Sequence, residues 1–180
     1  MQHRHTHLLV YVALLLGIGS VGYAVTKTSP AAAPPAAMDT GDATIASAAG
    51  CSSSFLQHTY NPARLLSLKP CIKATGTVEV IRHEKDGDWH VLLRLDKGQS
   101  GLLNDGNLRL QKGDLVVEPQ CVGAVVQPDA IAPCQGATPP AGIQLIKIGA
   151  HITVTGPWVN DLQHGWLEIH GPSVITSAGG

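Results

Sequence analysis

The chain has 180 residues, and its twelve Lys and Arg against thirteen Asp and Glu give a formal net charge of -1. This balance predicts that nucleic acid is not a partner, because phosphate binding depends on clustered cations. The length allows one compact hydrophobic core, since only residues 51–180 have a globular composition.

Residues 8–25, from Leu8 to Val25, are uncharged and mostly apolar, and they lie between Arg4 and Lys27. A stretch of this length without a polar stripe is typical of an export signal or a membrane-spanning helix. We therefore expect residues 1–27 to be a signal peptide or a transmembrane anchor, with the membrane as a partner. The flanking charges favour an extracytoplasmic location for the rest of the chain, either anchored by this N-terminal helix or secreted after cleavage.

Residues 28–50 consist mainly of Ala, Pro, Ser, Thr and Gly and contain almost nothing large enough to bury. We expect them to form a disordered linker. The folded domain is then expected at residues 51–180, with a short lead-in that ends at Pro70.

The folded domain is predicted to be all-β with a small α content. An Asp86-Gly87 pair between the first two strands is typical of a hairpin turn, and a turn of helix is expected near residues 128–134. The five expected strands are residues 75–82, 88–95, 115–118, 151–156 and 165–170. Two hairpins separated by a longer break favour a five-stranded antiparallel barrel of the oligonucleotide/oligosaccharide-binding (OB) type, in which the third strand lies between the second and the fifth. The alternatives are another small antiparallel barrel or an open sheet with the same hairpins.

The four cysteines allow three pairings, and disulfides are the expected state in an exported chain. Pairing of neighbours is the simplest solution and joins Cys51 to Cys71 and Cys121 to Cys134. A zinc site is the alternative, but the sequence has no Cys-x-x-Cys pair to favour it.

A polar face is predicted from the alternation of side chains along the strands. In the second strand Asp88 and His90 point to one side, while Val91 and Leu93 are on an apolar row. The fifth strand repeats this pattern. The candidate ligand-binding residues are Asp88, His90, Glu118, His164, Trp166, Glu168 and His170.

Imidazole and carboxylate groups together suit a divalent metal or acid–base catalysis. We therefore name His90, His170 and Glu168 as candidate metal ligands. Their spacing matches no known signature such as His-Glu-x-x-His, so no cofactor is assigned and no catalytic residue is named. The alternative interpretation is structural: these are half-exposed positions whose polar groups pair with one another.

The segments 86–90 and 164–170 resemble a group of uncharacterised bacterial exported proteins with an OB-like fold. Those proteins pair an Asp-x-aromatic-His strand with a terminal Glu-(Ile/Leu)-His strand that continues into Pro-Val, where this chain has Gly171-Pro172-Ser173-Val174. The resemblance spans residues 71–175 and implies an extracytoplasmic domain without implying an activity.

Two functions are compatible with these features. The first is an extracytoplasmic OB-like binding module that takes a small ligand, a glycan or a protein on the face of the second, third and fifth strands. The alternative is a metal-dependent hydrolase, for example a phosphodiesterase, that uses the Asp/His/Glu face.

Overall fold

The computed structural model describes residue 51 and residues 55–179. The predicted signal or anchor at residues 1–27 and the predicted linker at residues 28–50 lie outside this part of the chain. Within the described residues, no helix is both long enough and apolar enough to cross a membrane.

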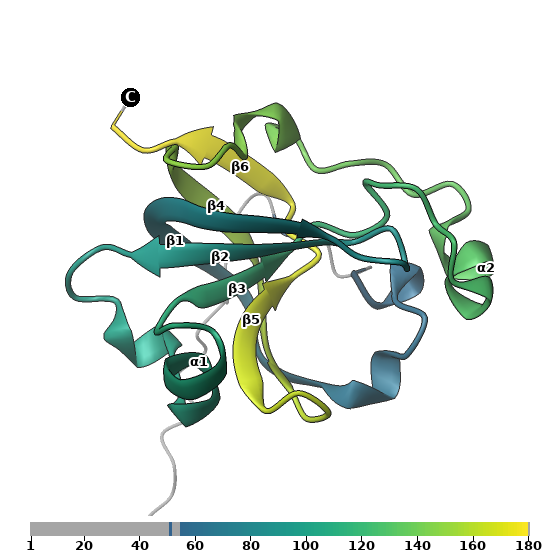
Figure 1. The fold of residues 1–180 in the computed structure, drawn as a ribbon, viewed down its shortest axis with the longest axis horizontal. Helices are drawn as coiled ribbons and strands as arrows, with labels where there is room; N and C mark the ends of the chain where they lie inside the picture. Colours follow the sequence, from purple (N-terminus) through teal and green to yellow (C-terminus); the bar gives the residue numbers. More distant parts are fainter. Residues whose placement is uncertain (1–50, 52–54, 180) are drawn as a thin grey trace, which may run out of the picture. The chain divides into compact units, whose positions relative to one another are not determined.

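The described residues fold mainly into one six-stranded sheet, with short helical turns between the strands (Figure 1). The strands are β1 Leu65–His83, β2 Trp89–Leu95, β3 Leu115–Glu118, β4 His151–Asp161, β5 Trp166–His170 and β6 Val174–Ser177. The α-helices are α1 Asp105–Leu110 and α2 Ile131–Cys134. The 3-10 helices are η1 Phe55–His58, η2 Pro62–Arg64, η3 Ser100–Leu102, η4 Pro128–Ala130 and η5 Ile143–Leu145.

Five of the strands form a ring. The sheet order is β1-β2-β3-β5-β4-β6, and β1 also pairs with β4, which closes the ring. The third strand lies between the second and the fifth, as the sequence predicts. The prediction of an antiparallel, five-stranded arrangement is corrected in two ways, because β3 and β5 run parallel and because β6 adds a sixth strand along β4.

The first strand begins earlier than the sequence suggests. Residues that were expected to form a lead-in ending at Pro70 are the first half of β1, where they pair with β4. The register shifts between Lys69 and Ile72, and Pro70 lies in this irregular stretch. A proline without an N–H is tolerated there, since no ladder hydrogen bond has to come from it.

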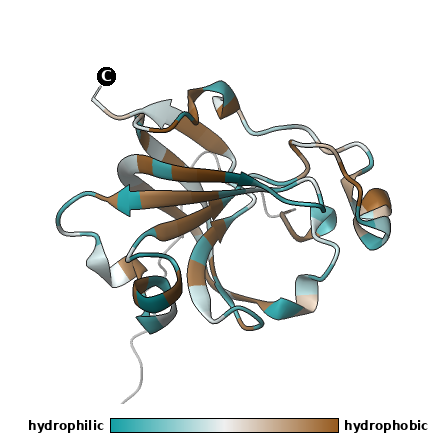
Figure 2. Cartoon of the chain, viewed as in Figure 1, coloured by the Kyte–Doolittle hydropathy of each residue, from teal (hydrophilic) through white to brown (hydrophobic). Residues whose placement is uncertain are grey.

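One face of the strands is apolar and the other carries polar side chains. In β2, Val91 and Leu93 join the hydrophobic core, whereas His90 points to the other side. Figure 2 shows how hydrophobic residues follow the strands of the ring. The buried core residues are Ala74, Val78, Val91, Leu93, Leu115, Val117, Ile146, Ile152, Val154, Ile169 and Ile175.

Helix α1 is attached to the first residues of β5 by the buried side-chain amide of Asn107. Asn104 and Asn107 form a capping box at the start of α1. The Asn107 side chain also donates to the Leu167 carbonyl at 2.9 Å and accepts from the Leu167 N–H at 2.9 Å. This exchange ties the helix to the strand that carries the predicted site.

Both predicted disulfides are confirmed, Cys51 to Cys71 and Cys121 to Cys134. Such bonds are typical of proteins in an oxidising compartment outside the cytoplasm. The first bond connects the segment before η1 to β1, and the second connects the loop after β3 to the last residue of α2.

Gly76 lies where β1 changes partner, since it pairs with Leu95 of β2 and also with Ile152 of β4. A Cβ at this position would lie 2.8 Å from the carbonyl carbon of Arg94 and 3.0 Å from the Cα of Leu95. We expect Gly76→Ala to lower the free energy of unfolding by about 1–3 kcal/mol, because backbone cannot move aside easily. Chemical denaturation measures this change.

The matched control is Gly101→Ala, because nothing lies within 4 Å of a Cβ there. Equal stability of the two variants would contradict the close approach of β1 and β2 at Gly76.

Candidate functional site

A cavity of about 350 Å³ opens on the polar face. Five of the predicted residues line it, namely Asp88, His90, Glu118, His164 and Trp166. The other two, Glu168 and His170, are fully buried beside it. Cations from other segments also line this cavity, which we call the charged pocket: Arg64, Arg82 and Lys85.

The centre of the site is a buried contact between His170 and two glutamates. The His170 Nδ1 lies 2.9 Å from Glu168 Oε1 and 3.1 Å from Glu118 Oε2. Burial by itself lowers the pKa of His170, but the hydrogen bonds and charges of Glu118 and Glu168 outweigh it and raise the pKa to about 10. The ring is therefore an imidazolium at neutral pH.

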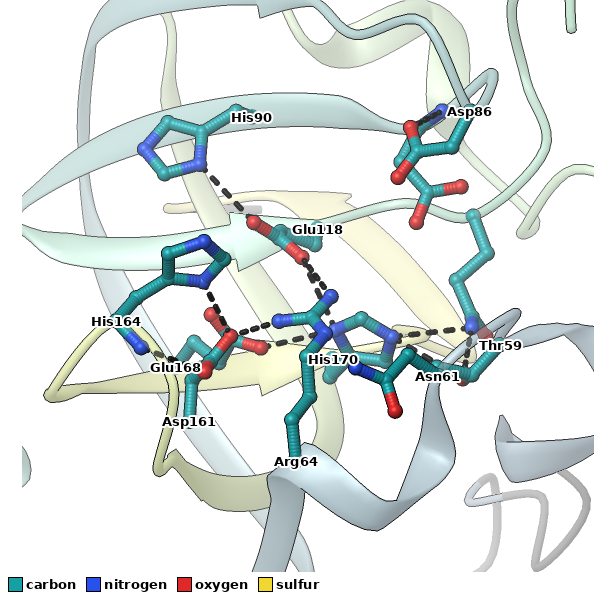
Figure 3. A network of polar contacts seen from close by, with 12 residues as sticks. Thr59, Asn61, Arg64, Asp86, His90, Glu118, Asp161, His164, Glu168 and His170 are labelled. Atoms are coloured by element: carbon teal, nitrogen blue, oxygen red, sulfur yellow. Dashed lines mark hydrogen bonds and ion pairs between the residues drawn. The ribbon is translucent and has the colours of Figure 1, made fainter. Parts of the chain in front are cut away.

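Glu118 connects two histidines. Its Oε1 accepts from His90 Nδ1 at 3.0 Å, while its Oε2 faces His170, and Figure 3 shows it between the two rings. Burial raises the pKa of Glu118, yet the two histidines overcome this effect and hold the pKa well below its usual range. Glu118 is therefore ionised at neutral pH.

His90 is held at both ring nitrogens. Its Nδ1 faces Glu118, and its Nε2 lies 3.1 Å from the Gln111 side-chain oxygen. Burial lowers the pKa of His90, but the hydrogen bond to Glu118, the charge of Glu118 and the Gln111 oxygen together raise it. The ring also packs edge-on against Trp166, with centroids 5.6 Å apart.

The segment before β1 covers this face. Thr59 accepts a hydrogen bond from Gln120 Nε2 at 2.7 Å, lies 3.2 Å from His170 Nε2, and donates to the Phe55 carbonyl. The structural interpretation expected His90, His170 and Glu168 to be half-exposed, with their polar groups paired. All three are buried and the pairing is present, and Phe55 of η1 packs edge-on against His170 with ring centroids 6.5 Å apart.

Arg64 at the end of η2 and Asp161 at the end of β4 form a second buried ion pair. Asp161 Oδ1 also accepts the backbone N–H groups of Gln163 and His164, and Oδ2 faces His164 Nδ1 at 2.7 Å. This carboxylate therefore fixes the turn between β4 and β5. This turn places His164 against Trp166, and the two rings stack with centroids 4.7 Å apart.

Trp166 connects the stacked pair to the buried carboxylates. Its indole N–H donates to Glu168 Oε2 at 2.7 Å. Glu168 therefore accepts from Trp166 with one oxygen and from His170 with the other. Both oxygens are satisfied although the side chain is fully buried.

Asp88 differs from the other carboxylates of the site. Its Oδ1 accepts the Cys121 N–H at 2.7 Å, but no cation among the described residues forms an ion pair with it. Burial, followed by the charge of Asp86, raises the pKa of Asp88 to about 7. Asp88 therefore changes charge near neutrality at the wall of the charged pocket.

Two groups of side chains bring potential metal-ligand atoms together within the described residues. In the first, atoms of Asp88, Glu118 and His170 all lie within 4.8 Å of one another. The second combines Asp88 with Cys121 and Cys134, whose sulfurs are in a disulfide. The first group shares only His170 with the predicted ligand set of His90, His170 and Glu168, which stays a prediction.

Several residues of the site were not predicted from the sequence. They are Thr59, Arg64, Gln111, Gln120 and Asp161. One signal was present, since Asp161 precedes His164 by three residues in a polar turn and such carboxylates often accept turn N–H groups. The others come from segments whose position depends on long-range pairing.

Comparisons of the chain with protein-family models, with curated proteins and with solved structures found no match. The resemblance to exported OB-like proteins stays a prediction. The function is therefore argued from the site itself.

We expect Asp88→Asn to change the pH dependence of stability. Because the pKa of Asp88 rises from 3.8 to about 7 on folding, the folded protein binds the proton more tightly than the unfolded chain. The ionised carboxyl therefore destabilises the wild type as pH rises through this interval, by on the order of 4 kcal/mol when complete. Asparagine keeps an oxygen for the Cys121 N–H but cannot ionise.

The melting temperature of Asp88→Asn relative to wild type should increase between about pH 4 and about pH 8 in thermal denaturation followed by circular dichroism. Asp105→Asn, which changes an exposed carboxylate, is the control and should show no such trend. A constant difference for Asp88→Asn across this range would show that the Asp88 carboxyl is not desolvated.

Proposed function

We propose that this protein is an extracytoplasmic binding module with an OB-like barrel, and that the charged pocket holds a small ligand with a positively charged group. The fold proposal is supported by the closed order β1-β2-β3-β5-β4 and by the parallel pairing of β3 with β5. The extracytoplasmic location is supported by the two disulfides and by the apolar stretch at residues 8–25.

One observation carries the ligand proposal: Asp88 is a buried carboxyl on the pocket wall that forms no ion pair with a described residue, and burial outweighs the nearby charge of His170, which lowers its pKa. Arg64 is engaged by Asp161 and Glu118, and His170 is engaged by two glutamates. A cation in the pocket would supply the missing charge at Asp88. Burying an ionised carboxylate is costly unless it is paired, so such a ligand gains binding energy there.

The shape and the walls of the pocket support a small ligand rather than a protein partner. Its volume of about 350 Å³ is within the range of small-molecule sites. Tyr60 and Trp166 provide aromatic surface beside the carboxylates. Aromatic rings attract organic cations in addition to burying their apolar parts.

The network supports binding more than catalysis. His170 is fully buried, and both nitrogens of His90 are engaged by neighbouring oxygens. A general base needs a free nitrogen within reach of its substrate's proton, and neither ring offers one to the pocket. Their hydrogen bonds instead hold Glu118 in place.

A metal-dependent hydrolase is the second candidate, because Asp88, Glu118 and His170 bring potential ligand atoms within 4.8 Å of one another. Two carboxylates and an imidazole are suitable donors for a divalent ion such as zinc or manganese. The raised pKa of His170 opposes this function, since a metal-bound nitrogen must first lose its proton.

The test is a titration of the full-length, ¹⁵N-labelled protein, in mild detergent, with cadaverine and with its neutral isostere 1,5-pentanediol. We expect cadaverine to shift the Cys121 amide resonance, because that N–H donates to Asp88. We expect its affinity to increase as pH rises through about 7, since Asp88 then ionises. Pentanediol should have no effect.

Asp88→Asn should abolish the response to cadaverine, whereas Asp105→Asn should leave it unchanged. No shift at Cys121 or at the Trp166 indole with cadaverine would refute the ligand proposal. Parallel titrations with zinc, manganese and calcium, followed by an assay of bis(p-nitrophenyl) phosphate hydrolysis, test the second candidate. One-to-one ion binding together with hydrolysis would replace the binding module by the hydrolase.

A further inference from the structure

A second cavity, of about 340 Å³, lies on the other side of Gln120 and has the opposite chemistry. It is bounded by η1, by residues 137–141 and by the turn at residues 171–173. None of the described residues that line it is Asp, Glu, Lys or Arg. We call it the neutral pocket.

The walls of the neutral pocket are fixed by covalent and hydrogen bonds. The Cys51–Cys71 disulfide holds the chain just before η1, and the Cys121–Cys134 disulfide holds the end of α2. His58 of η1 donates from Nδ1 to the Pro133 carbonyl of α2 at 2.8 Å. The Ile175 N–H donates to the Ala141 carbonyl at 2.8 Å and so joins the 137–141 loop to β6. A cavity with walls tied in this way is preformed, which lowers the entropy that binding costs.

The floor of the neutral pocket contains a buried amide, Gln120, with one end unused. Gln120 is only 8% exposed, and its Nε2 donates to Thr59 Oγ1 and lies 3.1 Å from His170 Nε2. Its Oε1 accepts no hydrogen bond from the described residues, and it faces Gly171, which also lines the pocket. One end of the amide therefore faces the pocket, while the other end is held beside Thr59 and His170.

His58 presents a second polar group. Because its Nδ1 donates to the Pro133 carbonyl, Nε2 is the ring nitrogen that remains for a ligand. Phe55, Pro139, Pro140 and Pro172 add apolar ring surface. The prolines contribute backbone carbonyls without N–H groups, so the lining is rich in acceptors.

We propose that the neutral pocket is a second binding site and that its ligand is an uncharged sugar. A sugar ring offers several hydroxyl groups, each able to donate and to accept a hydrogen bond, for Gln120 and His58, and its apolar C–H faces pack on Phe55 and the prolines. A charged ligand would be buried there without a counterion, which is strongly unfavourable. The proposal depends on this cavity alone, and it holds whether or not the charged pocket takes a cation.

The experiment uses full-length, ¹⁵N-labelled protein in mild detergent and three probes of one ring shape: methyl β-D-glucopyranoside, glucosamine and glucuronate. Binding of the neutral glucoside should shift the Gln120 side-chain NH₂ resonances and the Gly171 amide in a saturable way. Glucosamine and glucuronate should bind at least about tenfold more weakly, a difference of ~1.4 kcal/mol. The Trp166 indole resonance, which reports on the charged pocket, should not move.

Thr138→Trp fills the neutral pocket from an exposed position and does not touch the Gln120 network, so it should abolish glucoside binding in a folded protein. Gln135→Trp, an exposed change outside the lining, should leave binding unchanged. The proposal is overturned by any of three results: no saturable shift with the glucoside, equal affinity for the charged sugars, or shifts at Trp166 in place of Gln120.

Discussion

The buried contact of Glu118 with His170 is the constraint on which the polar side of the ring depends. A buried charge that loses its partner destabilises a protein by about 3–5 kcal/mol, so this pair is tolerated only because both of its members are fully engaged. Glu118 is engaged by His90 as well, and His170 by Glu168 and Thr59. Thr59 reaches His170 only when the η1 segment lies over the face. The η1 segment and the Glu118–His170 ion pair therefore stabilise each other.

The same network separates two cavities of similar size and different chemistry. Glu118 lines the charged pocket, Gln120 lines the neutral pocket, and His170 lies buried between these two side chains. Asp88 forms no ion pair within this network, and one end of the Gln120 amide has no hydrogen-bond partner among the described residues. Polar groups that face a preformed cavity without a partner in the protein are available to a ligand. This contrast is the physical basis for proposing two ligands of different charge.

Local patterns predicted the parts of the fold that depend on neighbouring residues. The alternation in β2 and β5 placed His90, Glu168 and His170 on one face correctly, because side chains in any strand alternate with a period of two. Pairing of neighbouring cysteines was also correct.

The first half of β1 was missed because Pro70 argued against a strand, and its partner β4 is distant in sequence. Arg64 and Asp161 were missed for the same reason, since only closure of the ring brings them together. The burial of the site could not be predicted, because the alternation shows which side chains share a face but does not show what covers that face.

The central claim is that His170 is a buried imidazolium held between two carboxylates, and ¹⁵N chemical shifts of its ring measure this directly. In full-length protein labelled at histidine, both ring nitrogens of His170 should show the shifts of protonated nitrogens at neutral pH, and they should keep them until the pH approaches about 10. Glu118→Gln should lower that transition, because it removes one of the two charges that favour the cation. A His170 ring that is neutral at pH 7, with one bare nitrogen, would contradict the account.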